Sequence, residues 1–172
     1  MSNSSTDDTL SHRTPGTVRL AIARDIPDLV ALRRQMFESM GRPADAGWEA
    51  VASDLFSREL LTGRLVAAVV DSPDGSDQLV ASGVVMFELR LPSASSHATT
   101  KAYISSMSTY PKWRRRGFGS AILQRLIEVS EARGAHVIEL RATEDGRPLY
   151  EAAGFDVDAG MPLLRRYLAA SD

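Results

Sequence analysis

Stretches in which apolar and polar residues alternate, or in which apolar residues run together, predict the strands of this chain. Residues 17–23 alternate, which is typical of a strand with one covered face. Residues 65–70 are all apolar, which predicts a short buried strand, and residues 79–89 predict the strand that returns beside it after a turn. Further strands are predicted over residues 102–109, 137–140, 155–157 and 163–168.

In four other segments apolar residues recur every three or four positions, which is the period of a helix. The first predicted helix begins at Asp25, whose side chain we expect to cap it, and it ends before Gly41. The other predicted helices cover residues 45–61, 117–133 and 147–153. The resulting order is strand, two helices, three strands, helix, strand, helix and two strands. This order predicts an α/β fold, a mixed domain built on one central sheet.

Length and composition favour one folded domain with a short tail. The chain has 172 residues, of which 44% are hydrophobic, and a length of this order is ordinary for a single core. Residues 1–16 are rich in serine, threonine and aspartate and contain one large apolar residue, Leu10. We therefore expect a disordered tail over residues 1–16 and a folded domain over residues 17–172.

Charge and residue usage exclude several kinds of function. The net charge of −2 provides no general attraction for nucleic acid. With no cysteine and three unpaired histidines, neither a disulfide, a thiolate nucleophile nor a metal site is expected. No apolar run is long enough to span a membrane, and residues 1–9 lack the pattern of a secretory signal. We expect a cytoplasmic protein with no nucleic-acid or membrane partner.

The most informative segment joins a predicted strand to the helix over residues 117–133. Residues 111–120 read Pro-Lys-Trp-Arg-Arg-Arg-Gly-Phe-Gly-Ser. Gly117 and Gly119 let the backbone approach a bound group, and the first turn of a helix has unpaired N–H groups. Together they form an anion site suited to a pyrophosphate. A glycine-softened turn with a solvated basic cluster is the alternative, and neither a Rossmann nor a Walker pattern is present.

Two motifs in this order resemble those of the GNAT superfamily of N-acetyltransferases, in its bacterial small-acceptor type. Arg114-x-x-Gly117-x-Gly119, after a strand and a proline, resembles the acetyl-CoA loop, and residues 103–111 resemble the strand before it. Residues 146–155, Gly-Arg-Pro-Leu-Tyr-Glu-Ala-Ala-Gly-Phe, resemble the leucine-tyrosine-glutamate-x-x-glycine-phenylalanine element of the family. The resemblance covers residues 17–168. It implies a mixed sheet in which two parallel strands splay apart and bind CoA.

The resemblance also implies which residues hold acetyl-CoA, the acyl donor. The pyrophosphate would be bound by Arg114, Arg115, Arg116, Gly117, Phe118, Gly119 and Ser120. The pantetheine arm would pair with Met107, Ser108 and Thr109 as an added strand. Small side chains at Ser105, Ser106 and Ser108 would leave room for it. For these serines, the polar face of a half-buried strand is the alternative.

Tyr150 would be the general acid, because a phenol with a pKa of about 10 can protonate the departing CoA thiolate. The alternative is a core tyrosine whose hydroxyl is bonded to the backbone. Many members have an asparagine seven residues earlier that contacts CoA, but this chain has Thr143 there, so no contact is assigned. A base is also needed to deprotonate the amine. Glu88 is the first candidate, and His97 and Glu139 are the second choices. For each of the three, a solvated surface charge is the alternative.

The main hypothesis is therefore an N-acetyltransferase that passes acetyl directly from acetyl-CoA to an amine. A non-catalytic CoA-binding sensor or scaffold is the second hypothesis, and a nucleic-acid binder that stacks bases on Trp113 is the third. Small amines, antibiotics, amino acids and peptide N-termini all stay open as acceptors. Homodimers are common in the superfamily. Side chains that could line the acceptor pocket or the core are Met36, Phe37, Met40, Trp48 and Phe56.

Overall fold

The protein is described here by a computed structural model, which covers residues 16–42, 46–94, 96–158 and 166. It forms two compact units, residues 1–141 and residues 142–172. The predicted tail over residues 1–15, and all of the predicted strand over residues 163–168 except Arg166, lie outside the described residues.

The first unit contains a mixed sheet, as the sequence predicts, and the sheet has five strands. Its strands lie in chain order and are β1 (Val18–Leu20), β2 (Leu65–Asp71), β3 (Leu79–Leu89), β4 (Thr100–Thr109) and β5 (Ile138–Leu140). The first four pair antiparallel, whereas β4 and β5 are parallel. A parallel neighbour needs a crossover, and the helix between β4 and β5 in the chain provides it.

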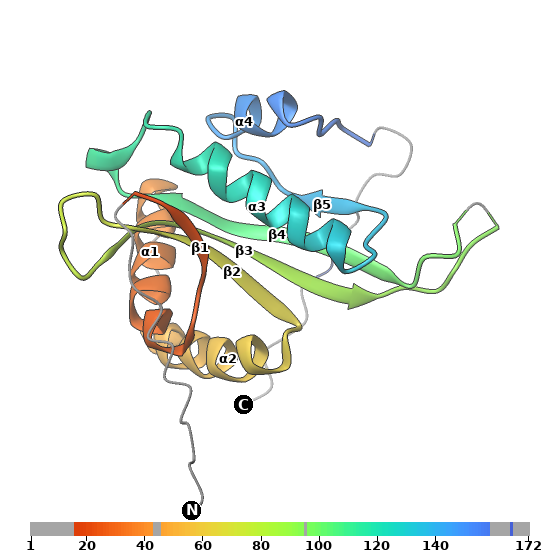
Figure 1. The fold of residues 1–172 in the computed structure, drawn as a ribbon, viewed down its shortest axis with the longest axis horizontal. Helices are drawn as coiled ribbons and strands as arrows, with labels where there is room; N and C mark the ends of the chain where they lie inside the picture. Colours follow the sequence, from red (N-terminus) through yellow and green to blue (C-terminus); the bar gives the residue numbers. More distant parts are fainter. Residues whose placement is uncertain (1–15, 43–45, 95, 159–165, 167–172) are drawn as a thin grey trace, which may run out of the picture. The chain divides into compact units, whose positions relative to one another are not determined.

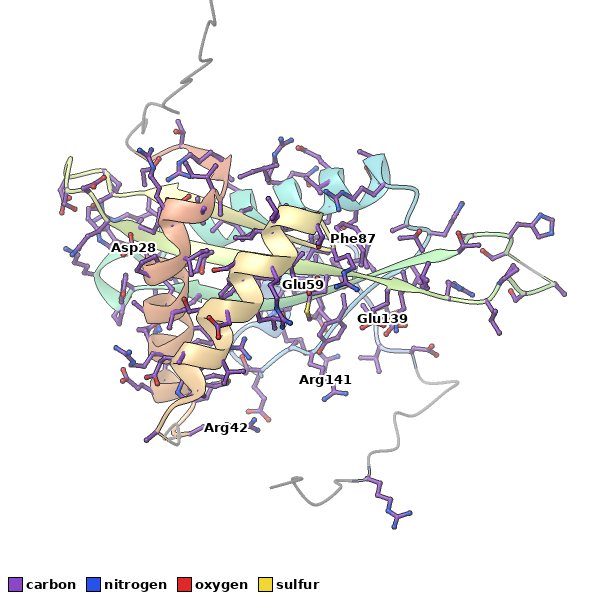
Figure 2. All side chains as sticks on the ribbon, turned by 90° about the horizontal axis from the view of Figure 1, so that it is seen from below. Asp28, Arg42, Glu59, Phe87, Glu139 and Arg141 are labelled. Atoms are coloured by element: carbon purple, nitrogen blue, oxygen red, sulfur yellow. The ribbon has the colours of Figure 1, made fainter. Side chains whose placement is uncertain are left out.

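Helices cover both faces of this sheet (Figure 1). Helix α3 (Phe118–Ala132) crosses one face, and α1 (Ile26–Ser39) and α2 (Trp48–Thr62) lie on the other. Figure 2 shows α1 and α2 side by side in front of the sheet, with Asp28 labelled on α1 and Glu59 on α2. Because both faces are covered, every residue of β2 is buried, which explains its continuous apolar sequence.

Two apolar layers result. On the α1 and α2 side the layer consists of Ile26, Leu29, Val30, Leu32, Phe56, Leu65, Ala67, Val69, Leu79 and Val84. On the other side Ile122 and Leu126 of α3 are fully buried and pack over Gly83 of β3. The absence of a side chain at Gly83 is what lets α3 approach the sheet closely at this point.

The start of α1 differs from the prediction. Asp25 precedes the helix, but its carboxylate makes no capping bond to the first turn. It accepts hydrogen bonds from the Ile22 N–H at 2.8 Å and from two nitrogens of Arg19 at 2.7 and 2.9 Å. Arg19 also bonds both oxygens of Asp71, at 2.9 and 2.8 Å. The capping prediction was wrong because a half-buried guanidinium from β1 takes the carboxylate.

The second unit contains helix α4 (Arg147–Ala152). The strand predicted over residues 155–157 is wrong, since residues 155–158 have no regular structure. The Phe155 N–H donates to the Tyr150 carbonyl at 3.0 Å, and the Gly154 N–H donates to the Glu151 carbonyl at 3.0 Å. These bonds close the helix, so the backbone of Phe155 is used as a cap and not in a sheet.

Candidate active site

Strand β4 contains a bulge at its centre. Ser82 of β3 is opposite Ser108 and Val84 is opposite Ser105, so one residue of β3 faces two of β4. Ser106 in the bulge has φ of 53°, a left-handed conformation that costs a non-glycine residue roughly 1–2 kcal/mol. Bulges of this kind bend a strand and re-aim its side chains, and they are common beside active sites.

Side chains from α1 hold the bulge. A guanidinium nitrogen of Arg33 donates to Ser106 Oγ, and Ser108 Oγ donates to Gln35 Oε1 at 2.8 Å. Both serines are 8% exposed. They are small, as the family resemblance implies, and they also connect β4 to α1. No local pattern indicates this second role, because Arg33 and Gln35 fall between the apolar positions of the helix.

Beyond the bulge, β4 has a free edge on the β5 side. The parallel pairing ends at Ile104 and Leu140, while β4 continues to Thr109. Among the described residues, none of β5 faces the segment that contains Met107, Ser108 and Thr109. Because β5 ends first, backbone groups of β4 in this segment have no β5 partner, and an extended ligand could pair with them. The splay of the two parallel strands stays a prediction.

The chain then turns into α3 through a run of unpaired amides. After a 3-10 turn (Pro111–Trp113), Arg115 and Gly117 take left-handed φ of 63° and 82°. No side chain caps α3, and within the described part of the chain the N–H groups of residues 115–120 have no acceptor. Successive amides in such turns, followed by the positive end of a helix, form a concave anion site.

The basic side chains of this turn surround a buried tryptophan. Trp113 is 8% exposed, with Lys112 and Arg116 over its ring at 5.1 and 4.6 Å from the centroid. Arg114 Nε donates to the Thr109 carbonyl at 3.1 Å, which fixes the turn to the end of β4. A buried ring cannot stack on a base, so this geometry argues against the nucleic-acid hypothesis.

Tyr150 belongs to the second unit. Its ring packs edge-on against Phe155, with centroids 6.1 Å apart. Burial raises the pKa of its hydroxyl above the ordinary value near 10, and the hydroxyl has no hydrogen-bond partner among the described residues. Thr143, at the position where many members have asparagine, accepts the Gly146 N–H at 3.2 Å through Oγ1. Thr143 therefore helps to fix the start of α4.

Glu88, the predicted base, lies near the end of β3 with an exposed side chain. Its carboxylate is 3.1 Å from Lys101 Nζ, which is also 3.2 Å from Glu139 on β5 (labelled in Figure 2). Lys101 is four positions before Ser105, so this cluster is roughly 13 Å along β4 from the bulge. His97 is exposed on the loop between β3 and β4.

The predicted acceptor residues divide into two groups. Phe56 is buried in the core. Trp48 is half-buried and packs edge-on against Phe37 with centroids 5.5 Å apart, and Arg33 lies over the Phe37 ring at 4.8 Å. Met36 and Met40 are half-buried on α1. The aromatic pair and Arg33 thus lie between α1, α2 and the bulge of β4.

A sequence model of the Acetyltransferase (GNAT) family matches residues 33–155. The chain belongs to this family. The matched region includes Arg33, the bulge, the amides before α3 and Tyr150. The GNAT resemblance noted in the sequence is therefore confirmed, as is the mixed α/β fold.

Solved structures agree with this membership. A predicted acetyltransferase with acetyl-CoA from Clostridium acetobutylicum is 28% identical with a TM-score of 0.76, covering 86% of this chain and 95% of that one. A GCN5-related N-acetyltransferase from Ralstonia eutropha JMP134 is 27% identical with a TM-score of 0.70, covering 87% and 97%. Glucosamine-6-phosphate N-acetyltransferase from Arabidopsis thaliana shares only the fold, at 15% identity with a TM-score of 0.71, covering 91% and 100%. No curated protein sequence matches the chain.

In the described ranges, no three histidine, cysteine or acidic residues gather where they could hold a metal ion. None of the described helices is long and apolar enough to cross a membrane.

Proposed function

We propose that this GNAT protein is an N-acetyltransferase that moves an acetyl group from acetyl-CoA directly to an amine. The observation that carries the proposal is the run of amides over residues 115–120, which have no acceptor among the described residues. The relative from Clostridium acetobutylicum, solved with acetyl-CoA, supports this choice of donor.

The residues of the first unit suit both ends of the donor. The diphosphate of CoA has oxygens that accept hydrogen bonds from consecutive amides, and the exposed Arg115 and Arg116 add positive charge. The pantetheine arm has amide groups that can pair with the free edge of β4 at Met107, Ser108 and Thr109. A ligand bound in this way runs from the start of α3 toward the bulge.

The proposed reaction is a single transfer. The amine nitrogen attacks the thioester carbon, the resulting tetrahedral intermediate breaks its carbon–sulfur bond, and the sulfur leaves with a proton. The chain has no cysteine, so no acyl-cysteine can form. We assign the proton donor to Tyr150, because its motif position and its raised hydroxyl pKa keep it protonated at neutral pH. Its unbonded hydroxyl is consistent with a proton donor.

The reaction also needs a base. An amine with a pKa near 10.4 must lose a proton before it attacks. Glu88 stays the predicted base, but its carboxylate would first have to leave Lys101, which holds it at 3.1 Å. The proton could then reach Glu88 only through water, because the cluster is distant from the bulge.

Two matched glycine variants test the donor site. Gly117 and Gly134 precede and follow α3, both have left-handed φ (82° and 72°), and a Cβ at either would have no atom within 4 Å. Gly117→Glu and Gly134→Glu therefore introduce the same strain and the same charge. Only the first places a carboxylate among the unpaired amides.

We expect Gly117→Glu to weaken CoA binding by about 100-fold or more in calorimetric titration, since placing like charges together costs several kcal/mol. Gly134→Glu should bind CoA within about threefold of the wild type. Equal CoA affinity in the two variants would refute the site. A thiol-release assay over a panel of amines then separates an enzyme from a CoA-binding sensor.

A further inference from the structure

Arg33 is a cation placed beside the bulge. It extends from α1, donates to Ser106 Oγ and lies over the Phe37 ring at 4.8 Å. Its side chain is half-buried. Ser106 immediately precedes the β4 segment proposed to pair with pantetheine, so the guanidinium lies at the end of that segment where the acyl group would arrive.

Among the described residues, this guanidinium has no counter-ion. No carboxylate among the described residues lies within 4.0 Å of it, whereas the adjacent Arg34 pairs with Glu49 at 3.1 Å. Burial lowers the pKa of Arg33, and no acidic neighbour offsets that effect. A cation partly removed from water and paired with no carboxylate is unfavourable, and an anion that arrived beside it would lower that cost.

A second donor comes from the same helix. Gln35 uses its Oε1 to accept from Ser108, and its amide nitrogen has no acceptor among the described residues. Apart from one lone pair on Gln35 Oε1, the unused hydrogen-bonding capacity of Arg33 and Gln35 consists of N–H donors. A guanidinium with free N–H groups suits a carboxylate or phosphate, whose oxygens accept two parallel hydrogen bonds.

We infer that Arg33 binds an anionic oxygen group, carboxylate or phosphate, on the acceptor amine. The inference rests on the proposed function and narrows its acceptor class from amines in general to amines that carry a negative charge. Phe37 and Trp48, which pack together next to Arg33, would then contact the apolar part of the same acceptor.

Pairs of acceptors that differ only in charge test this inference. Standard L-amino acids are compared with their α-amides, and phosphoethanolamine and glucosamine 6-phosphate with their unphosphorylated forms. Release of the CoA thiol gives kcat/KM for each acceptor. The wild type should prefer at least one anionic member over its neutral partner by about 10-fold or more. The carboxylate and phosphate pairs show which of the two groups is bound.

Three variants separate recognition of charge from support of the bulge. Arg33→Gln should reduce the preference to within about twofold, mainly through the KM of the anionic acceptor. Arg34→Gln, which removes the neighbouring charge, should keep the preference. Ser106→Gly removes the oxygen that Arg33 contacts while suiting the left-handed backbone, and it should also keep the preference. Loss of the preference in Ser106→Gly would assign Arg33 to support of the bulge and overturn the inference.

Failure of the inference differs from failure of the proposed function. A wild type that does not bind CoA in calorimetric titration contradicts both. A wild type that binds CoA but acetylates neutral and anionic members equally overturns only the role of Arg33. A wild type that binds CoA but releases no thiol with any amine contradicts both proposals.

Discussion

Replacement of Gly83 by alanine tests how closely α3 must approach the sheet. An added Cβ would lie 2.4 Å from Met107 Sδ, 2.7 Å from Ile122 Cγ2 and 3.0 Å from Leu126 Cδ1. The first and third are ends of flexible side chains that can move. Ile122 is fully buried and β-branched, so its rotamer is fixed in the helix and the backbone must shift instead.

We expect Gly83→Ala to lower the free energy of unfolding by about 1–3 kcal/mol, the usual cost of an added methyl group in a packed core. For a chain of this length, this corresponds to a decrease in Tm of roughly 2–12 °C. Trp48 and Trp113 both lie in the first unit and are the only tryptophans, so their fluorescence during denaturation by urea follows this unit.

The same change should disturb the donor site, because Met107 must move and belongs to the bulge. A double-mutant cycle with Met107→Ala should show less than additive destabilisation, since the second change removes the sulfur that the methyl group meets. CoA affinity should fall along with stability. A Gly83→Ala protein as stable as the wild type, with additive behaviour in the cycle, would refute the close packing of α3 and the bulge.

Other predictions concern the proton transfers and the buried charges. Tyr150→Phe should lower kcat by about 10²–10⁴-fold and leave the CoA Kd nearly unchanged. Because burial raises the pKa of the Tyr150 hydroxyl and the reaction needs its protonated form, wild-type activity should be lost only above about pH 10. An undiminished kcat would remove Tyr150 from the mechanism. If Glu88 is the base, Glu88→Gln should reduce the rate more at pH 7 than near pH 10, where the amine is already deprotonated; an equal effect at both pH values argues against that role. Asp25→Asn should lower the free energy of unfolding by about 3 kcal/mol, because it breaks a buried pair with Arg19. Glu59 pairs with the exposed Arg64, and this pair should contribute less to stability, so Glu59→Gln should change the free energy of unfolding by less than about 1 kcal/mol. Similar losses for Asp25→Asn and Glu59→Gln in denaturant titration would contradict this difference.

The local sequence predicts much of the proposed donor site. The period of residues 117–133 predicts α3, and the observed helix, Phe118–Ala132, differs by one residue at each end. Gly117 at the start of α3 has a left-handed φ, which glycine adopts without steric cost, so no tertiary contact is needed to hold it there. The apolar run over residues 65–70 also predicts β2, and residues 79–89 predict the returning strand β3, because the pattern of apolar positions follows burial.

Tertiary structure decided how the polar residues are partnered. Asp25 looks like a helix cap in the sequence, but Arg19 takes its carboxylate. Glu88 looks like a free base, but Lys101 lies 3.1 Å away. Arg33 looks like a surface residue of α1, yet it reaches the bulge of β4, 73 positions later in the chain. Each of these partners comes from another strand or helix, so no local pattern contains it.

This difference between what local sequence predicts and what tertiary structure decides has a physical cause. Helices, strands and glycine turns depend on backbone preferences and on which face is apolar, and residues close together in the sequence set both. The bulge in β4 and the place of Arg33 beside it depend on how β3, β4 and α1 come together, with Gly83 allowing α3 to close on the opposite face. The sequence alone therefore indicated the family, and it predicts where an acyl donor would bind. Only the packed structure placed Arg33 at the bulge, with no carboxylate of the described residues within 4.0 Å, and the proposed class of acceptor rests on that placement.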